Sequence, residues 1–518
     1  MKAFVEALVL LLPIAPFLNL SRNPGFLRRL SLFPRVFGVL SFCLLAYLTV
    51  SILLVFSFPQ YTALVITLAS PPALYLYFWR ARPVFGSDKR LPPGSLQIAP
   101  SGPWVDYLYY RKQADKYGPI FKMNHFVQPM ICLTGIHMGT EFLKHHEDST
   151  VTPPMPFNRY IPNGFMRYMA PGVHMEYRNT MKVIFSDSGF LEKKAESLCG
   201  IIRENLFRMA DGSKAINPVP HLKNMAFAIF AGLFLGLSHQ DPAFRRLQEL
   251  YNTIDYRNAL FFSKRKTENA LREIEDIFLK HALTHDSYFR NFLEDTATGC
   301  PKHAQDKTLL RNFIFLLQTS WIDVSDLLTW AFKLLSDNPH WADILRTNLH
   351  SEDAAVIQSA HQLANRIVLE TLRLEQSEYL MRKALHDIQF EGYLIPKGWL
   401  VRIGIRESHR DPEIFANPHE FNPDRFLTSS YGPKQYSPFG IQQKSCVGKG
   451  LTLWIGQKFV LELASGLQWK VVQDGPRQLG FFHWRPNSRL RVRMFRFSQV
   501  GRTMSIPNGH SSPVGEKG

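Results

Sequence analysis

The stretch Phe439-Gly440-Ile441-Gln442-Gln443-Lys444-Ser445-Cys446-Val447-Gly448 places one cysteine in a loop between two glycines, just before an apolar helical run. A cysteine binds a metal as the thiolate, which is favoured by backbone N–H donors and by a nearby cation. The two glycines permit a tight turn, and Lys444 supplies positive charge. A plain buried thiol has the same pattern, so the assignment depends on residues elsewhere.

Two further motifs precede this loop. Glu370 and Arg373 lie on a helical pattern at spacing i, i+3, so they share one helix face and can form an ion pair. Arg425 lies in Phe421-Asn422-Pro423-Asp424-Arg425-Phe426, which follows His409-Arg410-Asp411-Pro412. The order of these motifs is therefore a Glu-x-x-Arg helix, an Asn-Pro-Asp-Arg-Phe segment and a cysteine loop.

In order and spacing these motifs resemble the cytochrome P450 family, over roughly residues 90–500. The resemblance implies a mainly α fold with small β-sheets (α+β), preceded by N-terminal transmembrane helices. It implies haem b (iron protoporphyrin IX) as cofactor and Cys446 as the metal ligand. It also implies a buried triad that holds the cysteine loop and a set of residues that border the haem. The triad is Glu370, Arg373 and Arg425, and the bordering residues are Phe439, Lys444 and Gly448.

Three basic residues are candidates for the haem propionates. Arg382, before Asp387, matches the position from which family members reach a propionate. The segment from Tyr177 to Lys182 resembles the family's Trp-Arg-x-x-Arg helix, with tyrosine in place of tryptophan and the second basic residue one place late. Arg178 and Lys182 are therefore expected to bind propionates as well.

The distal helix departs from the family pattern. Counted back from Pro339 without gaps, the family's Ala-Gly-x-Asp-Thr stretch falls on Thr319-Ser320-Trp321-Ile322-Asp323. Asp323 then stands at the alcohol position, and Ile322 at the acid position. Asp323 relays protons itself, or the reaction needs no delivered protons, or the register is off by one and Asp323 takes the acid position. Thr319, Ser320 and Asp323 are the catalytic candidates.

Other departures concern the cysteine loop and the substrate side. Gln442 stands where the family usually has glycine, and Lys444 where it has arginine, which keeps the charge but loses bidentate geometry. Leu374–Leu380 replaces a segment that usually contains prolines, so we expect an atypical substrate. The substrate-pocket candidates are Trp321, Ile322 and Tyr379, which indicate an apolar pocket with polar points.

The charge and the cysteine content of the chain indicate which binding partners and which compartment to expect. The formal net charge is +17, yet no basic run with interleaved aromatic residues and no Cys/His finger spacing occurs, so we expect no nucleic-acid partner. A membrane surface or an acidic redox partner suits this charge better. The five scattered cysteines, an odd number, indicate a reducing compartment rather than a disulfide framework.

The N-terminal region is predicted to be membrane-bound. No charged residue occurs in the 44 residues from Val36 to Trp79, which exceeds one membrane span. We expect a membrane region at 1–85 with spans at 36–58 and 61–79 and a possible extra segment at 3–20. A proline-rich hinge at 86–97, a haem-binding catalytic domain at 98–500 and a disordered tail at 501–518 follow. Basic flanks at both outer ends favour a catalytic domain on the cytosolic side, in the endoplasmic reticulum.

These features predict a haem-thiolate monooxygenase that oxidises a hydrophobic small molecule in secondary metabolism. A terpenoid, sterol, polyketide or fatty-acid-like substrate suits the apolar pocket. Electrons are expected from NADPH through NADPH-cytochrome P450 reductase or a similar flavoprotein. One alternative is a haem-thiolate isomerase, dehydratase or rearrangement enzyme that needs no reductase. The other is a non-catalytic haem-binding membrane protein.

Overall fold

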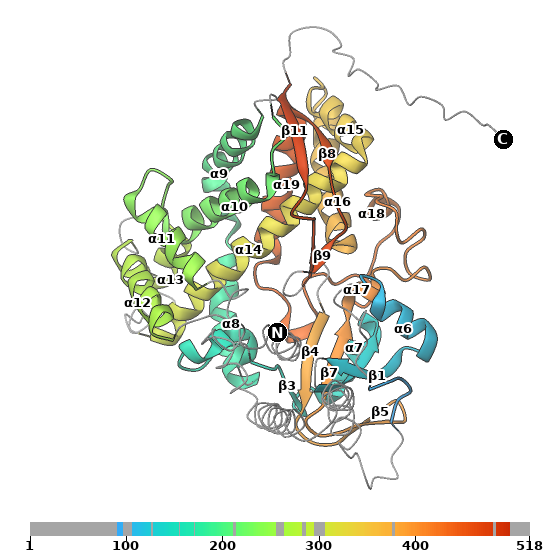
Figure 1. Ribbon diagram of the computed structural model, residues 1–518. Coiled ribbons are helices and arrows are strands. Elements are labelled where there is room, and N and C mark those ends of the chain that lie inside the picture. Colours follow the sequence, from blue (N-terminus) through green and yellow to red (C-terminus); the bar gives the residue numbers. More distant parts are fainter. Residues whose placement is uncertain are drawn as a thin grey trace, which may run out of the picture.

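The structure is a computed structural model that describes residues 91–96, 106–125, 128–154, 156–169, 171–210, 214–254, 264–281, 286–294, 306–375, 379–479 and 483–497. The predicted membrane region 1–85, with its spans, and the predicted tail 501–518 lie outside these residues. The expectation of a mainly helical fold with small sheets is confirmed (Figure 1).

Helices form most of the described chain. They are α6 (Tyr109–Tyr117), α7 (Ile136–His146), α8 (Pro171–Phe185), α9 (Ser188–Met209), α10 (Pro218–Leu235), α11 (Pro242–Thr253), α12 (Lys264–His281), α13 (Tyr288–Glu294), α14 (Lys307–Asp337), α15 (Pro339–Leu349), α16 (Ala354–Leu374), α17 (Ile405–Ser408), α18 (Arg425–Thr428) and α19 (Lys449–Gly466), with short 3-10 turns at Pro156–Tyr160, Met166–Tyr168 and Gln442–Lys444.

The strands form one five-stranded sheet and three two-stranded sheets. They are β1 (Ile120–His125), β2 (Gln128–Thr134), β3 (Thr150–Val151), β4 (Tyr379–Ala384), β5 (Ile388–Phe390), β6 (Tyr393–Ile395), β7 (Leu400–Gly404), β8 (Leu467–Gln473), β9 (Gln478–Leu479), β10 (Trp484–Arg485) and β11 (Arg491–Arg496). The larger sheet has the order β1-β2-β7-β4-β3, in which only β2 and β7 pair in parallel. Strand β7 lies in the middle of this sheet and is buried at every residue, as a central strand should be.

Helix α14 is the axis of the helical part. The side chain of Asp306 caps it by accepting hydrogen bonds from the backbone N–H groups of Thr308 (2.8 Å) and Leu309 (3.3 Å). It ends at Asn338, because Pro339 cannot continue the helix and instead opens α15. The apolar run from Phe313 to Leu317 is buried, and α14 packs against α10. Figure 1 shows α14 crossing the middle of the molecule, with α11 to α13 on one side.

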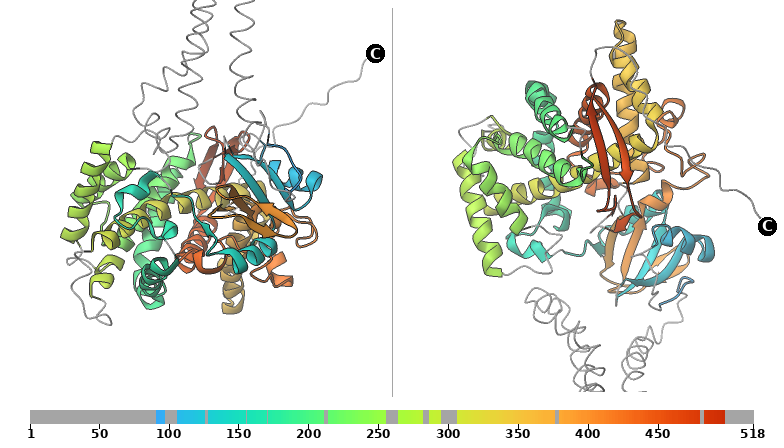
Figure 2. Two further views of the ribbon diagram at one scale, coloured as in Figure 1. Left: turned by 90° about the horizontal axis from the view of Figure 1, so that it is seen from below. Right: turned by 45° about the horizontal axis from the view of Figure 1, so that its top comes forward.

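The hydrophobic core has two main parts. The larger part lies among α9, α10, α14, α16 and α19, and the smaller part covers the five-stranded sheet and α7. Figure 2 shows the β8–β11 pair against the helices, away from the five-stranded sheet. The cysteine loop runs from the sheet side to the start of α19, so it joins the two parts.

Residues 91–96 of the predicted hinge lie along strand β1. The backbone N–H of Lys122 donates to the Pro93 carbonyl (2.7 Å), and the Lys122 ammonium donates to the Pro92 carbonyl (2.7 Å). Leu91 and Leu96 pack against the core of the sheet. This part of the proline-rich segment is therefore attached to the folded domain.

Among the described residues, one helix is long and apolar enough to cross a membrane. This helix is α10, which has a mean hydropathy of 1.2 and is 61% buried inside the fold. Its burial against α9 and α14 follows from that composition, and a core helix passes the same test as a membrane span.

Candidate active site

A cavity separates the cysteine loop from one face of α14. Cys446 lines it from the loop, and Thr319, Ser320 and Asp323 line it from α14. These three positions are spaced as one helix face requires. Much of the remaining wall is apolar, and the side chains that form it include Phe157, Phe165, Phe230, Phe234, Leu316 and Leu327. The predicted catalytic residues therefore share one apolar chamber with the predicted metal ligand.

The cysteine loop has the tight geometry that its glycines predict. Gly440 has φ +84°, which favours glycine. The backbone N–H of Cys446 donates to the Phe439 carbonyl at 2.8 Å, which closes the turn. A Cβ atom added at Gly448 would meet the Cys446 Sγ at 3.8 Å. Phe439, Lys444 and Gly448, the three residues predicted to border the haem, also line the cavity.

The Cys446 thiol opens onto the cavity and is enclosed by protein on its other sides. This burial raises the pKa of Cys446, and the Asp323 carboxylate across the cavity acts in the same direction. The backbone N–H of Gly448 and the charges of Arg167 and Arg178 lower it. A bound metal cation would deprotonate the thiol outright.

Gln442 has φ +54°, a left-handed conformation that suits glycine better than glutamine. Its side-chain Nε2 donates to the Thr140 carbonyl at 3.0 Å, which ties the loop to α7. The departure from the family's glycine therefore adds local strain and one exposed hydrogen bond.

We expect Gln442→Gly to raise the free energy of unfolding by about 0.5–1 kcal/mol. The left-handed conformation costs a non-glycine residue about 1–2 kcal/mol, and the greater chain entropy of glycine offsets part of the gain. Gln442→Ala is the matched control, because it keeps the strained conformation and loses the side-chain bond. Urea unfolding should give the glycine variant a higher free energy of unfolding than the alanine variant. The reverse order would show that the backbone at residue 442 is not strained.

Five basic side chains gather beside the cysteine loop: Arg167, His174, Arg178, Arg382 and Lys444. The Arg178 guanidinium donates to the Ser445 carbonyl (2.5 Å) and to the Ser445 hydroxyl (3.1 Å). The Lys444 ammonium donates to the carbonyls of Arg167 (3.3 Å) and Met169 (3.2 Å). Both residues therefore fix the loop and line the cavity.

The side chains of the basic group repel one another electrostatically. Burial and the neighbouring Arg382 lower the pKa of Lys444 to about 8. Burial, Lys444, Arg178 and Arg382 lower the pKa of His174 to about 4. Such crowding of buried cations is costly unless anions compensate it. The site is thus suited to a ligand that carries negative charge next to the cysteine.

The comparisons with known proteins agree with this geometry. The family model for cytochrome P450 matches residues 323–481. Abscisic acid 8'-hydroxylase 2 of Arabidopsis thaliana is 24% identical over 420 residues, which cover 74% of this chain and 86% of the relative. Putative cytochrome P450 120 of Synechocystis is 26% identical over 451 residues, 78% of this chain and 96% of the relative.

A solved structure, retinoic acid bound cyanobacterial CYP120A1, superposes with a TM-score of 0.63 at 22% identity, covering 79% of this chain and all of that one. The chain belongs to the cytochrome P450 superfamily. Membership implies a haem, and the cavity beside Cys446 is where this P450 would hold it.

The basic group fits the two carboxylates of a haem. Arg382 is 2% exposed, and its Nη2 lies 3.5 Å from a Glu147 carboxylate oxygen. Among the described residues, Arg382 Nε and His174 Nδ1 are buried without a hydrogen-bond partner. The buried Arg382 N–H needs an acceptor, and a neutral His174 can donate from Nδ1 in one of its two tautomers. Arg178, His174, Lys444 and Arg382 therefore fit as propionate partners in this P450.

The triad behind the cysteine loop is assembled as the sequence suggests. The Glu370 carboxylate accepts from Arg373 Nε (2.7 Å) and Nη2 (2.8 Å) and from Arg425 Nε (3.0 Å). Arg373 also donates to the carbonyls of His409 (2.6 Å) and Pro418 (2.8 Å). The triad therefore joins α16 to the segment before the cysteine loop.

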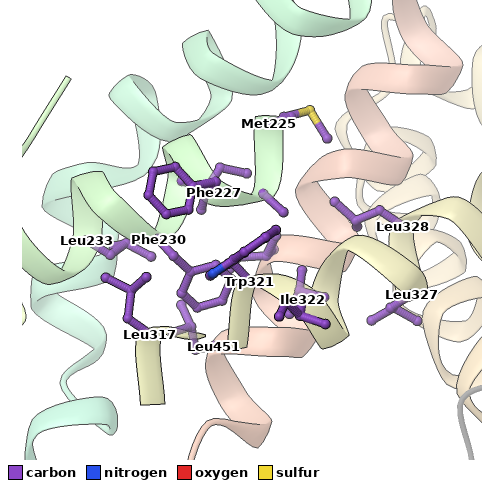
Figure 3. Close-up of a cluster of buried hydrophobic side chains, with 14 of the residues drawn as sticks. Met225, Phe227, Phe230, Leu233, Leu317, Trp321, Ile322, Leu327, Leu328 and Leu451 are labelled. Carbon is purple, nitrogen blue, oxygen red and sulfur yellow. The ribbon is translucent and has the colours of Figure 1, made fainter. Parts of the chain in front are cut away.

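Four predicted site residues lie elsewhere. Lys182 is exposed on α8, outside the cavity lining. Trp321 and Ile322 point away from the cavity into the core between α14 and α10, where Trp321 contacts Phe227 edge-on (Figure 3). Tyr379 stacks beside the Arg402 guanidinium instead. None of these four side chains lines the cavity, so they do not belong to the proposed haem and substrate sites.

Three basic residues of the cavity wall were missed from the sequence: Arg167, His174 and His483. His174 precedes Arg178 by four residues, one helical turn, so the periodicity of α8 contained a usable signal. Arg167 lies within the short 3-10 turn Met166–Tyr168, and His483 comes from the far C-terminal part of the chain. Neither carries a local pattern that points to the cavity.

Proposed function

We propose that this P450 inserts one oxygen atom into an apolar small molecule, using dioxygen and electrons from NADPH through a flavoprotein reductase. It is a cytochrome P450 monooxygenase, an oxidoreductase, in keeping with relatives that are named as hydroxylases. The observation that carries the proposal is the single chamber that places Cys446 opposite Asp323 within an apolar wall.

When bound, haem would supply the redox chemistry, and a thiolate ligand would push electron density onto its iron. The residues of the chain have separate tasks in this scheme. Cys446 would bind the iron, and the basic group would bind the propionates. Asp323 holds a proton on a carboxyl oxygen and passes it toward the chamber, where its neighbours Thr319 and Ser320 offer hydroxyl groups. The phenylalanines exclude water and hold the substrate.

A terpenoid is the first substrate class to test. Relatives include hydroxylases named for abscisic acid, and a similar structure contains retinoic acid. Both compounds are isoprenoids, and the aromatic chamber suits such branched, apolar molecules. Sterols, polyketides and fatty acids should be tested as well, because the same apolar wall suits any apolar small molecule.

The proposed setting is the cytosolic face of the endoplasmic reticulum, with a role in secondary metabolism. The uncharged run from Val36 to Trp79 supports membrane anchoring. The net charge of +17 supports docking of an acidic partner, such as NADPH-cytochrome P450 reductase.

The difference spectrum of the dithionite-reduced protein with carbon monoxide tests the proposal without a substrate. A red-shifted Soret band of the thiolate type is expected. A band typical of neutral or imidazole ligation, or protein purified without haem, would remove the oxygenase proposal and favour a non-catalytic membrane protein.

A rearrangement enzyme is the second candidate, because a carboxylate and an isoleucine replace the family's alcohol and acid on α14. Isotope-labelled dioxygen separates the two candidates on a terpenoid panel supplied with reductase and NADPH. Label in the product supports oxygenation. Product formed without dioxygen and NADPH shows rearrangement or dehydration instead.

Asp323→Asn should lower the kcat of oxygenation about a hundredfold, as expected when a proton-transferring group is removed. The measurement is product formed from the terpenoid identified by the labelled-dioxygen assay. Haem content and the carbon monoxide spectrum should not change. Asp337→Asn, at an exposed position near the end of the same helix, is the matched control. An unchanged kcat in Asp323→Asn would show that no essential proton passes through this carboxyl group.

A further inference from the structure

A second acidic residue of α14, Asp326, holds a histidine at the wall of the cavity. Asp326 follows Asp323 by three residues and is 6% exposed. Its Oδ2 lies 2.9 Å from Nε2 of His483 and 2.7 Å from Nε of Arg485. His483 is itself 5% exposed and lines the same cavity as Cys446 and Asp323.

The strand that follows His483, β10, is fixed on α14 at a second point. The Trp330 indole N–H, four residues after Asp326, donates to the Trp484 carbonyl at 2.9 Å. The Trp484 ring packs edge-on against Tyr107 at 5.7 Å between ring centroids. The position of the His483 ring is therefore set before any ligand arrives, which lowers the entropy cost of a hydrogen bond to it.

The contacts of the ring determine what it offers to a ligand. Arg485 also contacts the Asp326 carboxylate, so His483 is not its only partner. A neutral ring that donates from Nε2 to Asp326 keeps an unshared electron pair on Nδ1. Nδ1 takes no part in this contact, and His483 lines the cavity. A hydrogen-bond acceptor in an apolar wall selects a ligand with a hydrogen-bond donor.

We propose that His483 accepts a hydrogen bond from a hydroxyl group of the substrate. The substrate class is then an apolar molecule that already carries a hydroxyl group. This assignment rests on the proposed function, because it places the polar end of the substrate in the chamber that Cys446 and Asp323 share. A hydroxyl-forming reaction must then act upstream on the carbon skeleton.

Three matched terpenoid probes test the assignment: geraniol, its methyl ether and geranic acid. Their dissociation constants are measured by calorimetry on the haem-loaded protein and on His483→Phe. The methyl ether keeps the oxygen and removes only the donor. We expect the ratio of the geraniol constant to the ether constant to increase about fivefold to tenfold in His483→Phe, as the loss of one hydrogen bond predicts. Binding of the ether should change little.

His239→Phe, at an exposed position outside the cavity lining, is the control, and its ratio should match that of the wild type. His483→Leu repeats the test if the phenylalanine variant does not fold. A ratio unchanged in the His483 variants would overturn the assignment and leave His483 as a link between β10 and α14. A larger effect on geranic acid than on geraniol would also overturn it, because it would indicate a cationic ring that binds carboxylates.

The carbon monoxide spectrum of the same wild-type preparation keeps this inference separate from the proposed function. A thiolate-type band with an unchanged ratio refutes the role of His483 alone. A changed ratio without that band supports the hydroxyl site and refutes the monooxygenase.

Discussion

Cys446→Ser should abolish the red-shifted Soret band of the reduced carbon monoxide complex completely. A serine hydroxyl stays protonated at neutral pH, so the iron would lose its anionic sulfur ligand. The effect should be total, because the electron donation that favours O–O cleavage comes from the thiolate itself. NADPH-dependent oxygenation should fall with it to the background rate.

Cys199→Ser is the matched control, because Cys199 lies on α9 outside the cavity lining. Its spectrum should equal that of the wild type. A thiolate-type band that survives in Cys446→Ser would mean that another cysteine binds the iron. The proposed site would then be wrong even if the enzyme class were right.

Glu370→Gln should destabilise the haem domain by about 3–5 kcal/mol, because it leaves buried charges without a counter-charge. Arg373 and Glu370 have fully buried side chains, and the side chain of Arg425 is 6% exposed. The amide has nearly the same shape as the carboxylate, so the loss reflects charge rather than volume. Urea unfolding followed by the Soret band measures the change.

An exposed ion pair provides the control for this variant. Glu204 pairs with Arg208 one turn later on α9, and both side chains are about half exposed. Glu204→Gln should cost at most about 0.5 kcal/mol, as exposed helix pairs do. If Glu370→Gln also lowers the free energy of unfolding by less than about 1 kcal/mol, the Glu370 charge is not needed. The backbone carbonyls that accept hydrogen bonds from Arg373 would then be enough to stabilise its buried charge.

The sequence predicted the residues whose spacing is local. Glu370 and Arg373 are neighbours on one helix face, and the glycines around Cys446 follow from the turn, so both could be found without a structure. Because α14 is one unbroken helix, its period places Thr319, Ser320 and Asp323 together at the cavity. The register counted back from Pro339, with Asp323 at the alcohol position, stays a prediction.

Prediction failed where the direction of a side chain depends on tertiary packing. Trp321 and Ile322 lie between the cavity residues Ser320 and Asp323 in sequence, yet the helix turns both side chains into the core. Lys182 comes four residues after Arg178, one place later than in the family pattern, and it is exposed on α8 outside the cavity lining. His483 reaches α14 from 157 residues away, a distance that no local pattern encodes.

The ties around the cysteine loop also constrain how the protein is made. Arg178 and Ser445 are 267 residues apart in the chain, yet they are directly hydrogen-bonded. A ribosome that adds about 5–20 residues per second takes roughly 13–50 s to cover that interval. During this time the basic group has no loop to hold, and the apolar face of α14 has no α19 to cover it. We therefore expect the nascent chain to depend on chaperones until its last fifth has been synthesised.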